Sequence, residues 1–154
     1  MRMWTSAVPM SRGPGVTNFV LHPRLAADSH LLCDWPLCRV MLMNDARYPW
    51  LILVPRRPEI IEVHELPACE RGVLIEEIAR ASGALKARSE VAKVNVGALG
   101  NIVPQLHVHV VGRSPHDAAW PGPVWGSGER TPYAPDRLES LAQELRTQLK
   151  TGKC

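Results

Sequence analysis

The stretch NIVPQLHVHVVGR, residues 101–113, decides how this chain is interpreted. Its valine-rich run is typical of a β-strand, yet polar residues stand at every second position, as Gln105, His107 and His109. Successive side chains of a strand point to opposite faces, so these three form one row. Two imidazoles and an amide are costly to bury without partners, so the row must face solvent, a cleft or a polar network. The opposite, core-facing row is Leu106, Val108 and Val110.

The residues alone leave three interpretations of this row open. The row could be a solvated strand face, or a metal site, since His-x-His on a strand presents two imidazoles to one ion. A metal would need a third ligand, but Arg113 stands four residues after the second histidine, and His64 or His116 would have to fold inward. In the third interpretation, one imidazole attacks phosphorus while its neighbours bind the phosphate oxygens.

The loop that precedes the row favours the third interpretation. The segment NVGALGN, residues 95–101, ends four residues before Gln105. Its two glycines, Gly97 and Gly100, would let backbone amides approach a phosphate closely.

The rest of the chain alternates strand and helix patterns. In residues 66–90, apolar side chains recur on one helical face, as Leu74, Ile78, Ala81 and Leu85 do. Short connections between strands favour antiparallel pairing, and helices packed on such a sheet define an α+β fold. We expect strands at 36–44, 49–55, 92–97 and 106–112, helices at 66–90 and 135–150, a short helix opened by Pro23, and a Pro- and Gly-rich loop at 120–128.

Composition limits the class of protein. The chain has 154 residues, of which 45% are hydrophobic and 21% charged, which predicts a single globular domain, 1–154. Residues 1–17 are expected to form a loose arm, and 114–154 a C-terminal arm and helix. The net charge of +3 is spread along the chain, so we expect no nucleic-acid polymer as a partner.

No apolar run approaches the ~20 residues that span a bilayer, and the N-terminus lacks the apolar core of a signal peptide. We therefore expect no membrane partner and a cytoplasmic protein with reduced thiols. The spacing of Cys33 and Cys38 is unusual for structural zinc. The cysteines are Cys33, Cys38, Cys69 and Cys154.

These motifs resemble those of the histidine-triad (HIT) superfamily of nucleotide hydrolases and transferases. The family motif is His-φ-His-φ-His-φ-φ, where φ is apolar, and QLHVHVV (105–111) fits it everywhere except at Gln105. Upstream, NDARYPWLILVP (44–55) resembles the nucleotide-binding hairpin of the family, and NVGALGN resembles its phosphate loop. The resemblance covers roughly residues 20–113. The tail, with DAAWPGPVWG (117–126), resembles a bacterial subgroup that also carries the glutamine.

The resemblance implies a HIT-like α+β fold with an antiparallel sheet of about five strands, and a role for each matching residue. His107 would attack the α-phosphorus, His109 would support the site by hydrogen bonding, and the Gln105 amide would bind the phosphate or the leaving group. The substrate-binding residues would be Asn101, which holds a phosphate oxygen, together with Gly100, Asn95 and Asn44. For Asn44 and Asn95, ordinary turn chemistry is an equal explanation.

Three tryptophans accompany the motif. Trp50 falls where other members often have histidine, and it could belong to the core or line the base pocket. Trp120 and Trp125 could contact a partner subunit or pack the C-terminal arm.

The function implied is a nucleotide hydrolase that acts on a nucleoside phosphoramidate or a dinucleoside polyphosphate through a nucleotidyl-histidine at His107. The alternatives are a nucleotidyltransferase with the same site, a nucleotide-binding module with little turnover, and a His-x-His metal protein. No cofactor is required, although a divalent ion could accompany the substrate phosphates, and a homodimer is implied. Because an amide is a poor acid, Gln105 could weaken activity, redirect it, or confine it to good leaving groups.

Overall fold

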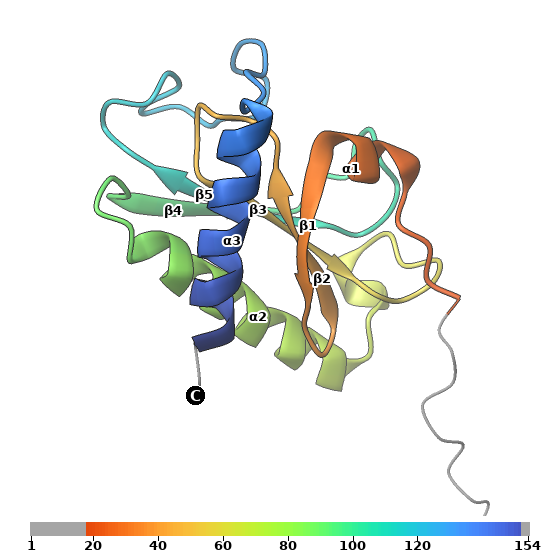
Figure 1. Cartoon of the computed structure of the whole chain (residues 1–154). Coiled ribbons are helices and arrows are strands. Elements are labelled where there is room, and N and C mark those ends of the chain that lie inside the picture. Colours follow the sequence, from red (N-terminus) through yellow and green to blue (C-terminus); the bar gives the residue numbers. More distant parts are fainter. Residues whose placement is uncertain (1–17, 152–154) are drawn as a thin grey trace, which may run out of the picture.

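The computed structural model describes residues 18–151, so the arm expected at 1–17 lies outside the described residues. These residues form five strands and three α-helices, which are labelled in Figure 1. In chain order the elements are α1 (Pro23–Asp28), β1 (Ser29–Asp34), β2 (Cys38–Met43), β3 (Trp50–Pro55), the 3-10 helix η1 (Val63–Glu65), α2 (Ala68–Lys86), β4 (Lys93–Gly97), β5 (Val108–Arg113) and α3 (Pro135–Thr151).

The strands form one antiparallel sheet in the order β1-β2-β3-β5-β4. This confirms the predicted α+β fold with an antiparallel sheet of about five strands. Strand β1, which the sequence analysis left without a strand assignment, lies at one edge of the sheet, and its register shifts between Leu31 and Cys33. Strand β5 begins two residues later than expected, because the N–H of Leu106 donates to the carbonyl of Ile60 instead of to a neighbouring strand.

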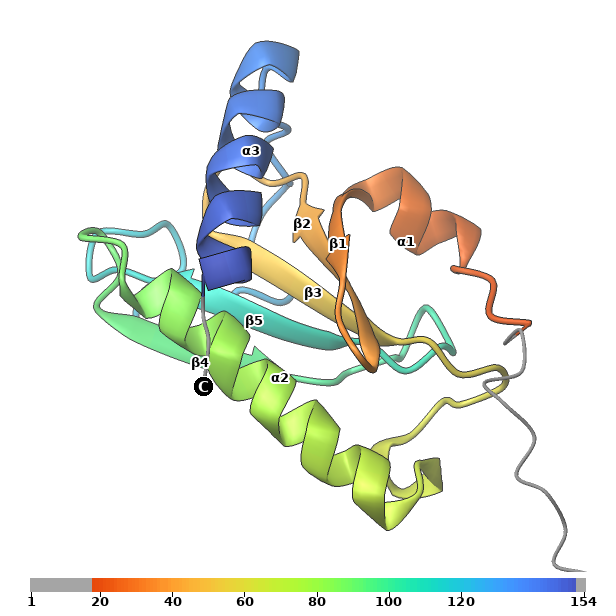
Figure 2. The same ribbon diagram turned by 60° about the horizontal axis from the view of Figure 1, so that its bottom comes forward.

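The alternation of side chains along β5 divides the interior into two cores. Leu106, Val108 and Val110 belong to the core between the sheet and helices α2 and α3, which lie on the same side of the sheet (Figure 2). Val111 belongs to the second core, on the opposite face. The predicted separation of the apolar row from the histidines is therefore confirmed. The histidine-bearing face is the one to which α1 contributes Leu25.

Helix α2 contributes both an apolar stripe and one buried carboxylate. Leu74, Ala81 and Leu85 are buried in the first core, as the spacing predicted. Glu77 is 5% exposed. Its two carboxylate oxygens accept the backbone N–H groups of Leu37 and Cys38 at 2.9 and 2.8 Å. Glu77 therefore satisfies two donors at the turn between β1 and β2, which would otherwise be buried without partners.

Among residues 18–151, no helix has the length and apolar character that crossing a membrane requires.

Candidate active site

The two motif histidines lie in a cavity of about 390 Å³ on the second face of the sheet. Its wall is formed by α1, by β2 and β3 with the turn between them, by the loop 99–103, by residues 107 and 109 on either side of the first residue of β5, and by the C-terminal segment 124–130. His107, His109, Gly100 and Asn101, all expected at the site, line this cavity together. The structure thus brings the histidine pair and the glycine-containing loop into one place.

His107 is held in a single tautomer by the main chain. Its side chain is buried, at 6% exposure, and its Nδ1 lies 2.6 Å from the carbonyl oxygen of Gln105. A carbonyl oxygen can only accept, so Nδ1 must carry the hydrogen. In the neutral ring, Nε2 then keeps its lone pair. Nε2 of His107 is therefore the ring nitrogen that presents a lone pair.

His109 has the opposite tautomer. The indole Nε1–H of Trp50 donates to Nδ1 of His109 over 3.0 Å. Because indole nitrogen is a donor only, Nδ1 must accept, and the hydrogen of the neutral ring lies on Nε2. Burial, and then the neighbouring His107, lower the pKa of His109 from 6.5 to about 4. At neutral pH, His109 is therefore an uncharged hydrogen-bond donor.

Aromatic rings enclose His109 on several sides. Its ring makes edge-to-face contacts with Trp50, Trp125 and His107, with centroid distances of 5.5, 5.8 and 4.9 Å. Trp125 comes from the C-terminal segment and packs on Trp50 and His109 of the same chain. It approaches Gly97 so closely that a Cβ atom there would lie 2.9 Å from its Cη2 atom. Gly97 thus makes room for an indole ring.

The Gln105 side chain has a different setting from the one expected. Its Oε1 accepts the backbone N–H of His22, and its Nε2 donates to the carbonyl of Val20, both over 2.9 Å. The amide thus fastens the segment before α1 and is not among the groups that line the cavity. Gln105 contributes to the site through its main-chain carbonyl, and the expected contact of its amide with phosphate has no geometric support.

Two expected substrate contacts lie elsewhere. Oδ1 of Asn44 accepts the backbone N–H of Tyr133 at 2.9 Å, which ties the end of β2 to the segment before α3. Oδ1 of Asn95 accepts from the guanidinium of Arg113 at 2.7 Å. Neither asparagine lines the cavity, and each makes a bond that supports the scaffold. The structure therefore does not bring them to the histidines.

The metal interpretation gains no third ligand from these residues. Arg113 is buried and pairs with the carboxylate of Asp117 at 2.8 Å, while His64 and His116 are exposed. In the part of the chain that the structure describes, no group of three or more His, Cys, Asp or Glu residues is arranged to hold an ion.

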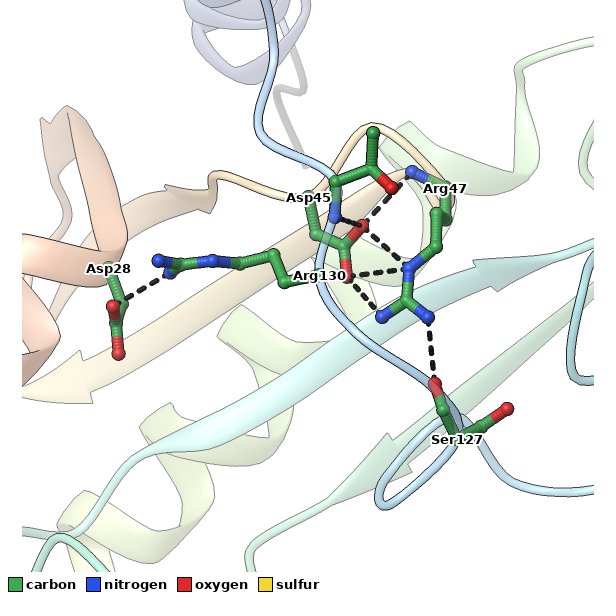
Figure 3. Close-up of polar contacts among 6 residues, drawn as sticks. Asp28, Asp45, Arg47, Ser127 and Arg130 are labelled. Carbon is green, nitrogen blue, oxygen red and sulfur yellow. Dashed lines mark hydrogen bonds and ion pairs between the residues drawn. The ribbon is translucent and has the colours of Figure 1, made fainter.

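A set of polar contacts that sequence reasoning missed fastens the C-terminal segment, which lines the cavity, to α1 and to the turn between β2 and β3 (Figure 3). Arg130 pairs with Asp28 of α1 at 2.7 Å. Arg47, in the turn between β2 and β3, pairs with Asp45 at 2.7 Å and donates to the carbonyl of Ser127 at 2.7 Å. Arg130 and Asp28 are 102 residues apart, and Arg47 and Ser127 are 80 residues apart, while DARY (45–48) indicated only a turn.

Asp45 is the buried centre of that set, at 1% exposure. Its carboxylate accepts hydrogen bonds from the side chain and N–H of Arg47 and from the N–H of Thr131. Burial acts to raise the pKa of Asp45, but these hydrogen bonds hold the pKa below its ordinary value. The carboxylate is therefore ionised at neutral pH and fully occupied by structural partners.

The fold and the paired histidines define an α+β protein with two oriented imidazoles in one cavity, and comparison with known proteins gives the family. The HIT domain model matches residues 24–116, so the chain belongs to the HIT family. HIT proteins bind nucleotides and are generally nucleotide hydrolases or transferases. No match was found among curated proteins.

Three solved structures are similar over most of the chain. A histidine triad protein from Marinobacter aquaeolei is 45% identical, with a TM-score of 0.83, over 86% of this chain and 96% of its own. One from Bradyrhizobium japonicum is 43% identical, with a TM-score of 0.82, over 85% and 98%. One from Sinorhizobium meliloti is also 43% identical, with a TM-score of 0.82, over 85% and 97%.

Proposed function

We propose that this protein is a nucleotide hydrolase that cleaves at the α-phosphate of a dinucleoside polyphosphate or a nucleoside phosphoramidate. The observation that carries the proposal is the 2.6 Å contact between Nδ1 of His107 and the Gln105 carbonyl. It places the hydrogen on Nδ1 and leaves the lone pair on Nε2 of a buried ring in the cavity. In the neutral ring, a lone pair so oriented can attack phosphorus directly.

The reaction proceeds in two displacements. Nε2 of His107 forms a bond to the α-phosphorus as the bond from phosphorus to the leaving group breaks, which gives a nucleotidyl-histidine. Water then attacks the same phosphorus, the bond to Nε2 breaks, and nucleoside monophosphate is released with a proton. Nε2–H of His109 and the amide of Asn101 are the donors that support the negative charge on the phosphate oxygens.

The setting of Gln105 bears on the leaving group. An amide bonded to Val20 and His22 supplies no proton to the departing atom, and an ionised phosphate needs none. An amine leaving group must be protonated, and its proton then comes from the substrate or from solvent. Dinucleoside polyphosphates are therefore the preferred class in this proposal, and phosphoramidates the second.

The proposal requires no cofactor, and a divalent ion would act only by neutralising the substrate phosphates. A homodimer is part of the proposal. Gel filtration should give about twice the chain mass of 17.1 kDa. Elution as a monomer would contradict the proposed homodimer.

Turnover of wild type and His107→Ala on a diadenosine polyphosphate and on adenosine phosphoramidate tests the proposal. His107→Ala should lower turnover by at least ~1000-fold, since loss of a covalent nucleophile leaves only binding and charge stabilisation. The matched control is His64→Ala, which removes an exposed histidine and should behave as wild type. Nucleotide binding without turnover in the wild type would replace the hydrolase with a binding module. Turnover that requires an added acceptor for the nucleotidyl group would replace the hydrolase with a nucleotidyltransferase.

A further inference from the structure

Trp50 is placed to control the second histidine. It lies at the start of β3, two residues before Ile52, which pairs directly with His109 on β5. Its side chain is 5% exposed and belongs to the core of that face. The indole N–H nevertheless has a partner, Nδ1 of His109 at 3.0 Å. Since a buried N–H without a partner is costly, this bond holds both rings in place.

A second tryptophan provides an internal comparison. Trp125 contacts the same imidazole at nearly the same centroid distance, 5.8 Å against 5.5 Å for Trp50. Its indole Nε1, although buried, has no hydrogen-bond partner among the described residues. Both tryptophans therefore pack on His109, but only Trp50 determines where the hydrogen of the imidazole lies.

We propose that Trp50 is a positioning residue that selects the Nε2–H tautomer of His109. The site then presents two different imidazole nitrogens to one substrate: a lone pair on Nε2 of His107, held by the Gln105 carbonyl, and an N–H on Nε2 of His109, held by the Trp50 indole. The first attacks phosphorus, and the second donates to a phosphate oxygen.

The tautomer assignment stands on the geometry alone, while its catalytic consequence rests on the proposed function. Without the indole N–H, Nδ1 of His109 would have no donor, and the ring would exchange between its two neutral forms. In the Nδ1–H form, Nε2 would turn a lone pair toward a negatively charged oxygen. The substrate would then meet repulsion at the position where wild type offers a hydrogen bond.

The test is nitrogen-15 NMR of the histidine side chains at neutral pH, in wild type, Trp50→Phe and Trp125→Phe. Chemical shifts of the two ring nitrogens report directly which one carries the hydrogen. Wild type and Trp125→Phe should show His109 wholly as Nε2–H, whereas Trp50→Phe should show a mixture with the Nδ1–H form. Site-specific replacement of Trp50 by benzothienylalanine, which has sulfur in place of N–H and the same shape, should give the same mixture if the phenylalanine variant fails to fold.

Kinetics complete the test. Outright removal of a donor to a transition-state oxygen costs ~100- to 1000-fold in kcat, so a partial loss of the correct tautomer should lower kcat by about tenfold with KM little changed. A His109 that remains wholly Nε2–H in both Trp50 replacements would overturn the proposal, whatever the activity. If wild type has no turnover, the proposed function fails, but the NMR spectra still decide the tautomer.

Discussion

Acidification should lower the free energy of unfolding of this protein, because the unfolded chain binds a proton at His109 that the folded chain excludes. Burial holds the pKa of His109 at about 4 in the folded chain, against 6.5 for the exposed side chain. Between these values the unfolded chain binds a proton that the folded chain excludes, so stability is present above pH 6.5 and is lost as the pH falls toward 4. With 1.36 kcal/mol per pKa unit, the loss is about 2 kcal/mol from pH 7 to pH 5 and about 3 kcal/mol at pH 4.

The assay is urea unfolding at pH 7, 6 and 5, compared between wild type and His109→Gln. The glutamine cannot titrate, but its carbonyl can still accept the Trp50 N–H. All other titrating groups are common to both proteins, so the difference between the two pH dependences isolates His109. From pH 7 to pH 5, the free energy of unfolding of wild type should fall by about 2 kcal/mol more than that of His109→Gln. Parallel pH dependences would refute the conclusion that the folded chain holds His109 in its neutral form.

Three further predictions concern the scaffold of the site. Gln105→Ala should lower the free energy of unfolding by ~1–2 kcal/mol, because two hydrogen bonds are lost. It should lower kcat by less than about tenfold, because the main-chain carbonyl that holds His107 remains. A loss of kcat as large as that of His107→Ala would instead show that the amide is catalytic. Glu77→Ala should cost ~3 kcal/mol by leaving two buried N–H groups unpaired, whereas exposed Glu76→Ala should stay within about 0.5 kcal/mol in the same denaturation curves. Gly97→Ala places a methyl group 2.9 Å from the Trp125 ring, so the indole must shift and the ring-current shifts of the His109 protons should change; an unchanged NMR spectrum would contradict this packing.

The fold was largely predictable because the sequence patterns that indicate its strands and helices extend over only a few neighbouring residues. The apolar row of Leu106, Val108 and Val110 and the apolar stripe of 66–90 each depend on neighbours within a few residues, and both lie in the first core as predicted. Strand β1 was not predicted, because its buried and exposed residues do not alternate regularly and its register shifts within the strand. The period-two pattern also failed at Gln105, since β5 begins only at Val108 and alternation applies only within a strand.

The site was predictable in its central residues and not in their partners. The motif identified His107 and His109, but the groups that fix their hydrogens come from different parts of the chain. Trp50 lies 59 residues before His109, and the Gln105 amide binds a segment 83 residues away. Such contacts depend on strand order and loop path, which spacing along the sequence does not reveal. The ion pair between Arg130 and Asp28, which are 102 residues apart, was not predicted for the same reason.

Formation of a nucleotidyl-histidine at His107 can be observed by mass spectrometry of the protein quenched in alkali during turnover of a diadenosine polyphosphate. Alkali preserves a phosphorus–nitrogen bond to histidine, so the peptide that contains His107 should gain the mass of one adenylyl group, with the modification on His107. The same peptide from His107→Ala should gain nothing. Rapid turnover with no adduct at any quench time, together with retained activity in His107→Ala, would contradict the nucleotidyl-histidine mechanism.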